Sequence, residues 1–600
     1  MKYITLNNGY DFINEKELLN VLLKNRGVNN PRQLLDLNEQ VVHDGMLLKN
    51  MDEALNLLHK YIEKSKDEIV NIHIIIDSDC DGYTSSAYAI NYLNDLIKNN
   101  KLKINITYSL HKGKEHGIII RELENYNFDL LIVPDAGSND VKECNILKEQ
   151  GKDILILDHH DIDTENKCAI VVNCKDKQYP NETLAGVGVV HKFFKEYDKK
   201  YGYNFANKYI DLVALGCIGD AMDLRNYETR YLVLKGLENI KNDFIKYIIK
   251  EQSYSLKDEI TIMGVGWYIA PLINAVVRSG TQEEKEDTFK ALIGVNELRE
   301  YKPRKNKNNP NPQIQQQPLQ EFMARVCKNV KGRQDREVKK GLIELNKKIT
   351  EKKLNDNKIL VVDCENIIDK TFTGLIANKL TSQYKKPVIV LRKKEGEEGV
   401  FGGSCRNYKL SPIVNLKEFL DELNTFNELS GHGNAFGFKI TLDNIIKTVN
   451  RANEKLKDIK IEDVYKVDYE VPIGRLKPKH ITQVGQWSNL WGNKLDEPLF
   501  AITDIYISTE DIKLMGSKKN IIRFDKKIGS NQITFIKFFA NEDTYNKMIM
   551  KQKRGLSTKQ VKKVKIDVIG KFKINKWQET EYPQIEIVDF NVSENKDFIF

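Results

Sequence analysis

The sequence lacks the features of a secreted or membrane protein. Its eight cysteines are scattered, with no Cys-x-x-Cys pair, which argues against a disulfide framework or a zinc site. The start, Met1 to Asn8, lacks the charged and then apolar pattern of a signal peptide. No uninterrupted apolar run approaches the roughly 18 residues of a membrane helix. We therefore expect a cytoplasmic protein that makes no membrane contact.

An excess of one charge is also missing. The 93 Lys and Arg residues and 85 Asp and Glu residues leave a formal net charge of +8. This mild excess permits a polyanionic partner but does not require one. A chain of 600 residues, 41% hydrophobic and 30% charged, is typical of a globular protein with several domains.

After a helical N-terminal segment, expected over residues 1–66, the sequence contains short runs of β-branched residues and leucine. These runs lie at 72–76, 130–133, 154–157 and 169–172, with charged amphipathic stretches between them. Strands that are buried on both faces and alternate with helices predict a parallel sheet. We therefore expect an α/β domain over residues 67–300.

The remainder of the chain divides by composition. Residues 301–353 combine a polar, proline-containing insertion at 302–318 with a charged connecting helix, and the insertion cannot build a core. Further apolar runs predict a second, smaller α/β domain over 354–460. Alternating strands then predict an all-β domain over 468–600.

Acidic and histidine clusters follow the first three strand-like runs. They comprise Asp77, Asp79 and Asp81 after the first run, Asp135 after the second, Asp158, His159 and His160 after the third, and the later Asp220. Ligands of parallel α/β sheets bind beyond the carboxyl ends of the strands, so these side chains should share one cleft. Carboxylates and imidazoles suit a pair of divalent cations. We infer a site that hydrolyses phosphate esters.

Each cluster alone also has a plain structural explanation. The segment Asp77–Gly82 could be a solvated acidic turn, and Asp135 could be a helix cap. His73 is a candidate ligand because it precedes Asp77 by four residues, but a lone histidine in an apolar strand is more often a satisfied core residue. Residues 84–86 (Thr-Ser-Ser) are expected to cap a following helix over 87–97.

The motif series resembles that of the DHH phosphoesterases. It consists of D-x-D-x-D-G at Asp77–Gly82, the strand-terminal Asp135, D-H-H at Asp158–His160, and Asp220 as the fourth motif. Segments at 172–189 and 271–278 resemble the RecJ family, those at 372–437 its DHHA1 domain, and those at 490–500 and 574–589 its oligonucleotide-binding (OB) domain. The resemblance spans roughly residues 70–600. Departures at Leu272, Val277 and Ser430 bear on substrate contacts and not on the metal site.

The resemblance implies a role for each motif residue. Two Mn²⁺ or Mg²⁺ ions would be held by Asp77, Asp79, Asp135, His159 and Asp220, with Asp135 between them. Asp81 and Asp158 would orient these groups, and His160 would contact the phosphate or the leaving group. The implied substrate-binding residues are Arg278, Ser404, Arg406, Gly431, His432 and Gly433.

The all-β domain adds candidate nucleic-acid contacts. Three of the four tryptophans lie in it, and residues 551–565 carry seven basic residues and no acid. Aromatic rings stack on bases while lysines follow the backbone, so Trp491, Trp577, Lys562 and Lys563 are candidates. The alternative is that the tryptophans belong to the core and that the lysines lie in a solvated loop.

Three functions remain open from the sequence. The first is a metal-dependent exonuclease that degrades single-stranded DNA, 5′ to 3′ if it follows the family, in repair, recombination or replication. The second is a short-oligonucleotide or cyclic-dinucleotide phosphodiesterase, and the third a non-catalytic nucleic-acid-binding scaffold. We expect a monomer, with a single-strand-binding protein or a helicase as a partner. The lysine- and asparagine-rich composition suggests an AT-rich genome, such as that of a bacterium or its phage.

Overall fold

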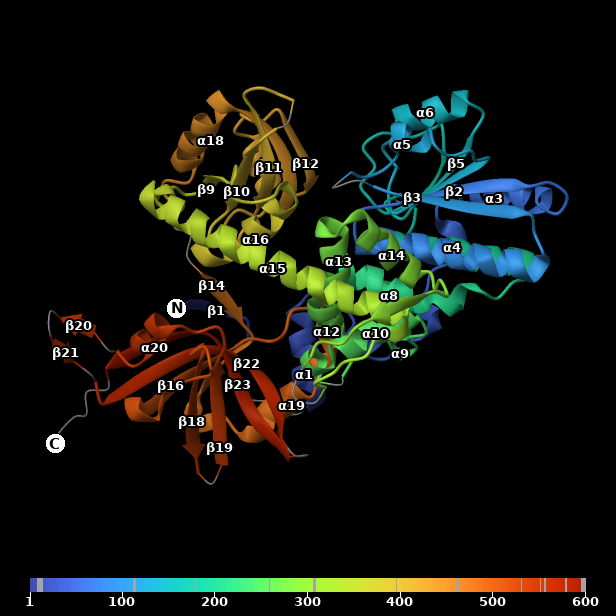
Figure 1. The fold of residues 1–600 in the computed structure, drawn as a ribbon. Helices are drawn as coiled ribbons and strands as arrows, with labels where there is room; N and C mark the ends of the chain where they lie inside the picture. Colours follow the sequence, from blue (N-terminus) through green and yellow to red (C-terminus); the bar gives the residue numbers. More distant parts are fainter. Residues whose placement is uncertain are drawn as a thin grey trace. The chain divides into compact units, whose positions relative to one another are not determined.

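The computed structural model shows two compact units (Figure 1). It describes residues 1–7, 15–111, 115–176, 178–257, 259–305, 309–394, 396–459, 463–529, 531–550, 552–554, 557–559, 561–577 and 580–594. One unit, termed the catalytic unit below, comprises Gln33–Glu344 and Ile368–Phe372. The other comprises Met1–Arg32, Leu345–Ile367 and Thr373–Phe600.

A five-stranded sheet forms the centre of the catalytic unit. Its order is β3 (Ile104–Leu110), β2 (Val70–Ile76), β4 (Leu130–Pro134), β5 (Asp153–Asp158) and β6 (Ile170–Asn173). All neighbouring strands are parallel, which confirms the predicted parallel sheet. Strand β3 was not expected, because its half-exposed edge position allows polar residues such as Asn105 and Thr107.

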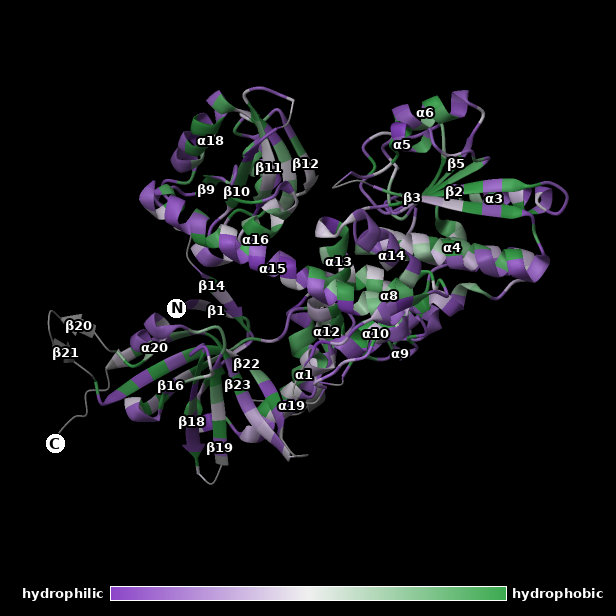
Figure 2. Cartoon of the chain, in the orientation of Figure 1, coloured by the Kyte–Doolittle hydropathy of each residue, from purple (hydrophilic) through white to green (hydrophobic). Residues whose placement is uncertain are grey.

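Both faces of this sheet are buried, which explains the continuous apolar runs. Ile72, Ile74 and Ile76 point into one core, which they share with α4. Ile75 and Leu131 point into a second core on the opposite face. The hydrophobic colouring of β2 and β5 in Figure 2 reflects this double burial. Because both faces are filled, the free surface for a ligand is the edge where the strands end.

Helix α4 (Cys80–Asn100) begins seven residues earlier than expected. Its N-cap is Asp79, whose carboxylate accepts hydrogen bonds from the backbone N–H groups of Asp81 and Gly82. The alternative of a solvated acidic turn over Asp77–Gly82 is therefore wrong, because Asp81 and Gly82 lie in the first turn of α4 and Asp77 and Asp81 are buried. The predicted capping role of residues 84–86 was wrong, since these side chains are buried inside the helix.

Helices surround the sheet and continue beyond it. They are α3 (Met51–Lys64), α5 (Ile120–Leu123), α6 (Val141–Glu149), α7 (Gly186–Tyr201), α8 (Ile210–Gly219), α9 (Tyr227–Glu238), α10 (Asp243–Glu251), α11 (Ser253–Leu256), α12 (Ile262–Gly264), α13 (Ala270–Ser279), α14 (Gln282–Leu292) and α15 (Leu319–Glu351). Among the described residues, one helical stretch, Ile262–Ser279, is long and apolar enough to cross a membrane, and half of it is buried inside the protein, as in a core helix.

Two paired strands lie at the start and at the end of the polar insertion. Strand β7 (Leu298–Tyr301) pairs antiparallel with β8 (Gln315–Pro318). Helix α15 follows directly and provides the charged connecting helix.

The second unit contains a mixed sheet that follows the connecting helix. Its order is β12 (Glu428–His432), β13 (Ala435–Thr441), β11 (Val400–Arg406), β10 (Val388–Lys393) and β9 (Leu360–Asp363). Only β9 and β10 are parallel among these described strands. Helices α16 (Thr373–Tyr384), α17 (Leu416–Asp421) and α18 (Leu442–Lys455) accompany the sheet.

A seven-stranded sheet follows in the same unit. Its order is β15 (Tyr469–Pro472), β16 (Phe500–Ser508), β22 (Lys563–Trp577), β23 (Thr580–Glu594), β19 (Asn531–Lys537), β18 (Ile521–Ile528) and β17 (Lys513–Met515). Two helices, α19 (Pro478–Gly485) and α20 (Glu542–Met548), and the short hairpin β20 (Gln552–Arg554) and β21 (Ser557–Lys559) complete it. The expected predominance of strands is confirmed.

The N-terminal segment was expected to be helical, but its first residues form a strand. Residues Lys2–Thr5 form β1, which pairs in parallel with β14 (Val464–Val467). Helices α1 (Glu15–Lys24) and α2 (Pro31–Leu35) follow. The pairing of β1 joins segments more than 450 residues apart, and no local sequence pattern reports such a contact.

We expect Gly82→Ala to destabilise the catalytic unit. A Cβ atom at Gly82 would lie 2.6 Å from the backbone oxygen of Asp77, which cannot move without displacing the Asp77 side chain. Overpacking of this kind costs roughly 1–3 kcal/mol. Gly332→Ala is the matched control, because its nearest neighbour is the flexible end of Arg336 at 3.6 Å; the control should be neutral or stabilising by about 0.5–1 kcal/mol. Denaturant unfolding measures both, and equal effects would contradict the expectation.

Candidate metal centre

The strand ends and two helix ends bring the predicted acidic and histidine residues together. Asp158 ends β5, His159 follows it, and Asp220 caps the C-terminus of α8. Within the described residues, three groups have donor atoms that all lie within 4.8 Å of one another. The groups are Asp77, Asp79 and Asp135; Asp81, His159 and Asp220; and Asp135, His159 and His160.

Asp135 belongs to two of these groups and is the most constrained member. Its backbone has a positive φ of 65°, a strained conformation for an aspartate that is typical of functional sites. Among the described residues its Oδ1 atom is buried without a hydrogen-bond partner, although Nε2 of His159 lies 3.1 Å away. A buried carboxylate oxygen without a donor is costly, and a cation would satisfy it. The donor set therefore fits hard divalent ions.

The carboxylates repel one another in this buried space. Burial, followed by the charges of Asp81 and Asp79, raises the pKa of Asp135 well above its usual range. Burial and the charge of Asp81 raise the pKa of Asp220 to about 8. Burial lowers the pKa of His159 to about 4, so this imidazole is neutral and able to bind a metal. The raised pKa values of these acids show that their negative charges are unfavourable here, and bound cations would offset these charges.

Asp81 and Asp158 are held by backbone donors. The carboxylate of Asp81 accepts hydrogen bonds from the N–H groups of Gly186 and Val187 at 2.6 and 3.2 Å, in the first turn of α7. Asp158 accepts from the N–H of Ser138 at 3.1 Å and lies 2.8 Å from Nδ1 of His160. Both arrangements support the predicted orienting roles.

His160 is held in its charged form. Burial lowers its pKa, but the hydrogen bond to Asp158 and the negative charges of Asp158, Asp77 and Asp220 together outweigh burial and raise the pKa to about 9. Burial raises the pKa of Asp158, but the hydrogen bond and positive charge of His160 lower it below its usual range. An imidazolium beside the acidic cluster suits contact with a phosphate oxygen or a leaving group.

Two histidines near Asp77 were missed by the sequence analysis. Nδ1 of His116 lies 2.8 Å from Oδ2 of Asp77, and this hydrogen bond raises the pKa of His116. Nε2 of His111 lies 3.8 Å from Oδ1 of Asp77. His111 directly follows β3, the neighbour of β2, so recognising that edge strand would have placed His111 at the same edge as Asp77.

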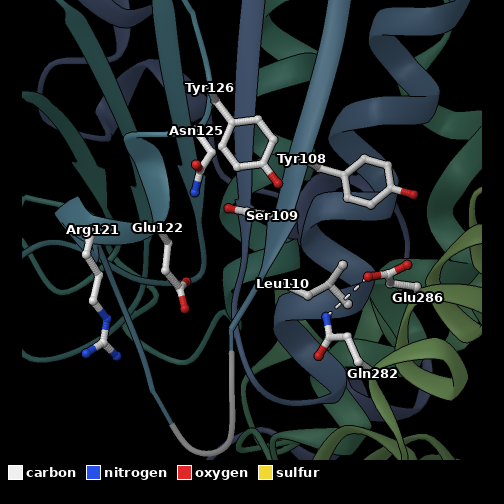
Figure 3. Close-up of a pocket in the computed structure, with 9 residues that line it drawn as sticks. All are labelled: Tyr108, Ser109, Leu110, Arg121, Glu122, Asn125, Tyr126, Gln282 and Glu286. Atoms are coloured by element: carbon white, nitrogen blue, oxygen red, sulfur yellow. Dashed lines mark hydrogen bonds between the residues drawn. The ribbon is translucent and has the colours of Figure 1, made fainter.

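A groove of about 640 Å³ is lined by residues of β3, α5 and α14 (Figure 3). Its lining residues come from β3, from α5 and the loop after it, and from α14: Tyr108, Ser109, Leu110, Arg121, Glu122, Asn125, Tyr126, Gln282 and Glu286. Glu122 lies 3.2 Å from Nδ1 of His111. The groove is therefore connected to Asp77 through one imidazole.

His73 does not belong to the cluster, contrary to its prediction as a candidate ligand. Its two ring nitrogens lie 2.8 Å from the hydroxyl of Thr107 and 3.0 Å from that of Ser109, both on β3. The ring is fully buried, and burial lowers its pKa to about 4. His73 is a satisfied core residue because the neighbouring strand supplies two hydroxyl groups.

The predicted substrate residues lie in both units. In the catalytic unit, Arg278 is half-buried near the end of α13. In the other unit, the hydroxyl of Ser404 lies 2.9 Å from that of Thr373, and a Cβ at Gly374 would lie 2.9 Å from the Arg406 guanidinium.

The remaining predicted substrate positions lie on the neighbouring strand and its turn. Arg406 is opposite Ala435, which is opposite His432, so these three positions form one row across three strands. Gly431 has a φ of 118°, and the carbonyl of Gly433 accepts a hydrogen bond from the N–H of Lys417. The side chain of His432 lies outside the described part of the chain.

Trp491 was a candidate for base stacking, with a core position as the alternative, and the structure shows the core position. Its side chain is 2% exposed and packs beneath the Arg26 guanidinium at 5.2 Å. A tryptophan in a small β domain is large enough to be needed in its core. The side chain of Trp577 lies outside the described residues, whereas Lys562 and Lys563 are exposed.

Known families and proteins match this chain along nearly its whole length. Residues 71–217 match the DHH family, N-terminal domain, residues 356–458 the DHHA1 domain, and residues 467–589 the RecJ OB domain. The chain is 36% identical over 599 residues to the putative SPbeta prophage-derived single-strand DNA-specific exonuclease YorK of Bacillus subtilis (strain 168), with 99% of both chains covered. The chain belongs to the RecJ family of DHH proteins.

More distant RecJ proteins agree with this assignment. The single-stranded-DNA-specific exonuclease RecJ of Bacillus subtilis (strain 168) is 25% identical over 592 residues, which cover 96% of this chain and 68% of that protein. The fold matches RecJ from Thermus thermophilus in complex with Mn²⁺, with a TM-score of 0.68 at 17% identity, covering 99% of this chain and 79% of that one. The resemblance seen in the sequence is confirmed.

We expect the metal-free protein to lose stability as the pH rises above about 6.5, the ordinary pKa of histidine. The buried carboxyls have a higher pKa in the folded protein than in the unfolded chain, so the folded state binds more protons. Stability should therefore fall between about pH 6.5 and the pKa of about 8 of Asp220, whereas below this window the buried His73 and His159, whose pKa is lowered to about 4, act in the opposite direction. Asp135→Asn should flatten this dependence, as measured by thermal unfolding in EDTA.

Added metal should reverse the effect in the wild type. A Mn²⁺ concentration one hundred times the Kd should stabilise it by about 2.7 kcal/mol, and Asp135→Asn should show little of this gain. Asp243→Asn is the control, because Asp243 is an exposed carboxylate in the same unit. An unchanged melting temperature in wild type on adding Mn²⁺ would count against the metal centre.

We expect His73→Gln to leave Mn²⁺ binding within about threefold of wild type, since His73 contacts hydroxyl groups and not the cluster. Its cost should appear as a stability loss of roughly 1–3 kcal/mol from the buried groups left unpaired. His159→Gln should weaken Mn²⁺ binding at least about tenfold. Isothermal titration calorimetry compares the two, and a similar loss in both would return His73 to the ligand set.

Proposed function

We propose that the protein is a metal-dependent exonuclease that hydrolyses phosphodiester bonds of single-stranded DNA, 5′ to 3′, in DNA repair, recombination or replication. The observation that carries the proposal is the buried cluster around Asp135, whose unpaired carboxylate oxygen and crowded acids fit two divalent cations. Its relative at 36% identity is named a single-strand DNA-specific exonuclease. The RecJ neighbours were solved with Mn²⁺ and with Mg²⁺.

The metal-holding residues would be Asp77, Asp79, Asp135, His159 and Asp220. When bound, two such cations acidify water and stabilise charge on the reacting phosphate. Asp81 and Asp158 keep their neighbours oriented through backbone hydrogen bonds. The protonated His160 is available to donate a hydrogen bond to a phosphate oxygen or a proton to the leaving oxygen.

Substrate binding is assigned to charged groups in both units. Arg278 and Arg406 would contact phosphates, and Ser404, Gly431, His432 and Gly433 would complete the contact in the second unit. The exposed Lys562 and Lys563 would follow the DNA backbone. In this proposal the enzyme is a cytoplasmic monomer of a bacterial or phage-infected cell, with a single-strand-binding protein or a helicase as its partner.

The test is degradation of a single-stranded DNA of about 40 nucleotides, labelled at the 5′ or the 3′ end, with and without Mn²⁺. We expect metal-dependent release of the 5′ label as a mononucleotide, and a loss of at least about 1,000-fold in Asp135→Ala, because this substitution removes the carboxylate shared by two donor groups. The rate is measured from initial product formation.

Asp243→Asn should degrade the DNA at the wild-type rate. Cleavage restricted to fragments of a few nucleotides would instead indicate a short-oligonucleotide or cyclic-dinucleotide phosphodiesterase. Tight DNA binding by a wild-type protein that degrades nothing would indicate a non-catalytic scaffold.

A further inference from the structure

Trp267 is unusually exposed for a tryptophan in a core helix. Its side chain is 69% exposed, and the adjacent Tyr268 is 43% exposed. The same helical stretch, Ile262–Ser279, is half-buried and contributes Ile269, Ile273 and other residues to the main core. Packing in the core and contact with the metal cluster therefore do not explain why a tryptophan is exposed at position 267.

Pro271 explains the backbone conformation at this position. Residues Val265–Ile269 form a turn of π-helix, in which the N–H of Ala270 donates to the carbonyl of Val265. A proline cannot donate to the carbonyl four residues earlier, and its ring clashes with that carbonyl; here that residue is Trp267. The wider turn relieves the clash, and such turns are frequent at functional sites.

Trp267 shares a helix face with residues beside the metal centre. Trp267, Pro271, Asn274 and Arg278 follow one another at spacings of three or four residues and are each at least partly exposed. The side-chain oxygen of Asn274 accepts a hydrogen bond of 3.1 Å from the N–H of Cys80, between Asp79 and Asp81. The face thus runs past the first acidic motif and has Arg278 at one end and Trp267 at the other.

Neighbouring small residues hold the start of this helix close to Asp220. A Cβ at Gly266 would lie 3.4 Å from Ile218, and one at Gly219 would lie 3.6 Å from Ala270. Both contacts lie within two residues of Asp220. The position of Trp267 relative to the metal centre is therefore fixed by close packing within the catalytic unit.

We propose that Trp267 is a base-stacking residue that holds the single strand along α13, away from the reacting phosphate. The inference rests on the proposed nuclease function and names a contact for its substrate. Trp267 and Arg278 are eleven residues apart, on the order of 16 Å along a helix, so one strand spans both residues only if it is several nucleotides long. An exposed indole face stacks on any base, which suits an enzyme that must pass every sequence.

Two substitutions separate stacking from simple loss of structure. In an Asp135→Ala background, which prevents degradation, Trp267→Ala should weaken binding of a dT oligonucleotide of about 20 nucleotides by roughly 5- to 150-fold. Trp267→Phe retains an aromatic face and should remain within about threefold of the parent. Fluorescence anisotropy measures the affinities, and circular dichroism melting confirms that each variant is folded.

Length dependence and intrinsic fluorescence locate the contact. A dinucleotide is too short to span from Arg278 to Trp267, so its binding should be insensitive to Trp267→Ala. The 20-nucleotide DNA should quench tryptophan fluorescence in the parent, and Trp267→Phe should reduce this quenching, because Trp267 is the most exposed tryptophan among the described residues. Tyr254→Ala is the control, since Tyr254 is 96% exposed but lies on α11, outside this helix face.

The outcomes distinguish this inference from the proposed function. If the wild type degrades DNA but Trp267→Ala binds both lengths like its parent, stacking at Trp267 is refuted and the nuclease function stands. An equal loss for both lengths would also refute it, because the effect would then not depend on distance from the cluster. If the wild type degrades nothing while Trp267→Ala weakens only the long DNA, the stacking contact stands and the nuclease function fails.

Discussion

Repulsion among buried carboxylates is the constraint on which the rest of this structure depends. Burial raises the pKa of Asp79, Asp81, Asp135 and Asp220, and the charges of neighbouring carboxylates raise the pKa of Asp79, Asp135 and Asp220 further. Such a cluster is unfavourable without cations, and it persists only because the surrounding elements hold it in place. Divalent cations neutralise this repulsion when they bind, and their binding to the folded state raises its free energy of unfolding. Metal binding and stability are therefore coupled.

The fold supplies the rigidity that this cluster requires. The parallel strands end at one edge, the first turn of α7 binds Asp81, and Asp79 caps the helix that begins beside it. Missing side chains matter as much as those present: a Cβ at Gly186 would lie 2.4 Å from the Asp135 carboxylate. Backbone groups and glycines therefore position the acids, which leaves their remaining oxygens for cations.

Much of the catalytic unit could be predicted from its sequence. The runs at 72–76, 130–133 and 154–157 are continuous because both faces of the sheet are buried, and each run ends at a motif residue. The predictions were wrong for residues whose role depends on which distant segments pack against them. His73 resembled a ligand until β3 supplied Thr107 and Ser109, and Trp491 resembled a stacking residue until the core enclosed it.

The sequence by itself determined the family, the parallel sheet and the principal acidic residues, because strand periodicity and motif spacing are local properties of the chain. Only the tertiary structure decided that His111 and His116 approach Asp77, that β1 pairs with β14, and that Trp267 is exposed while Trp491 is buried. The physical reason is that burial and contact depend on which distant segments pack together. A residue type records what chemistry a side chain can perform, and its neighbours in space decide whether it performs that chemistry.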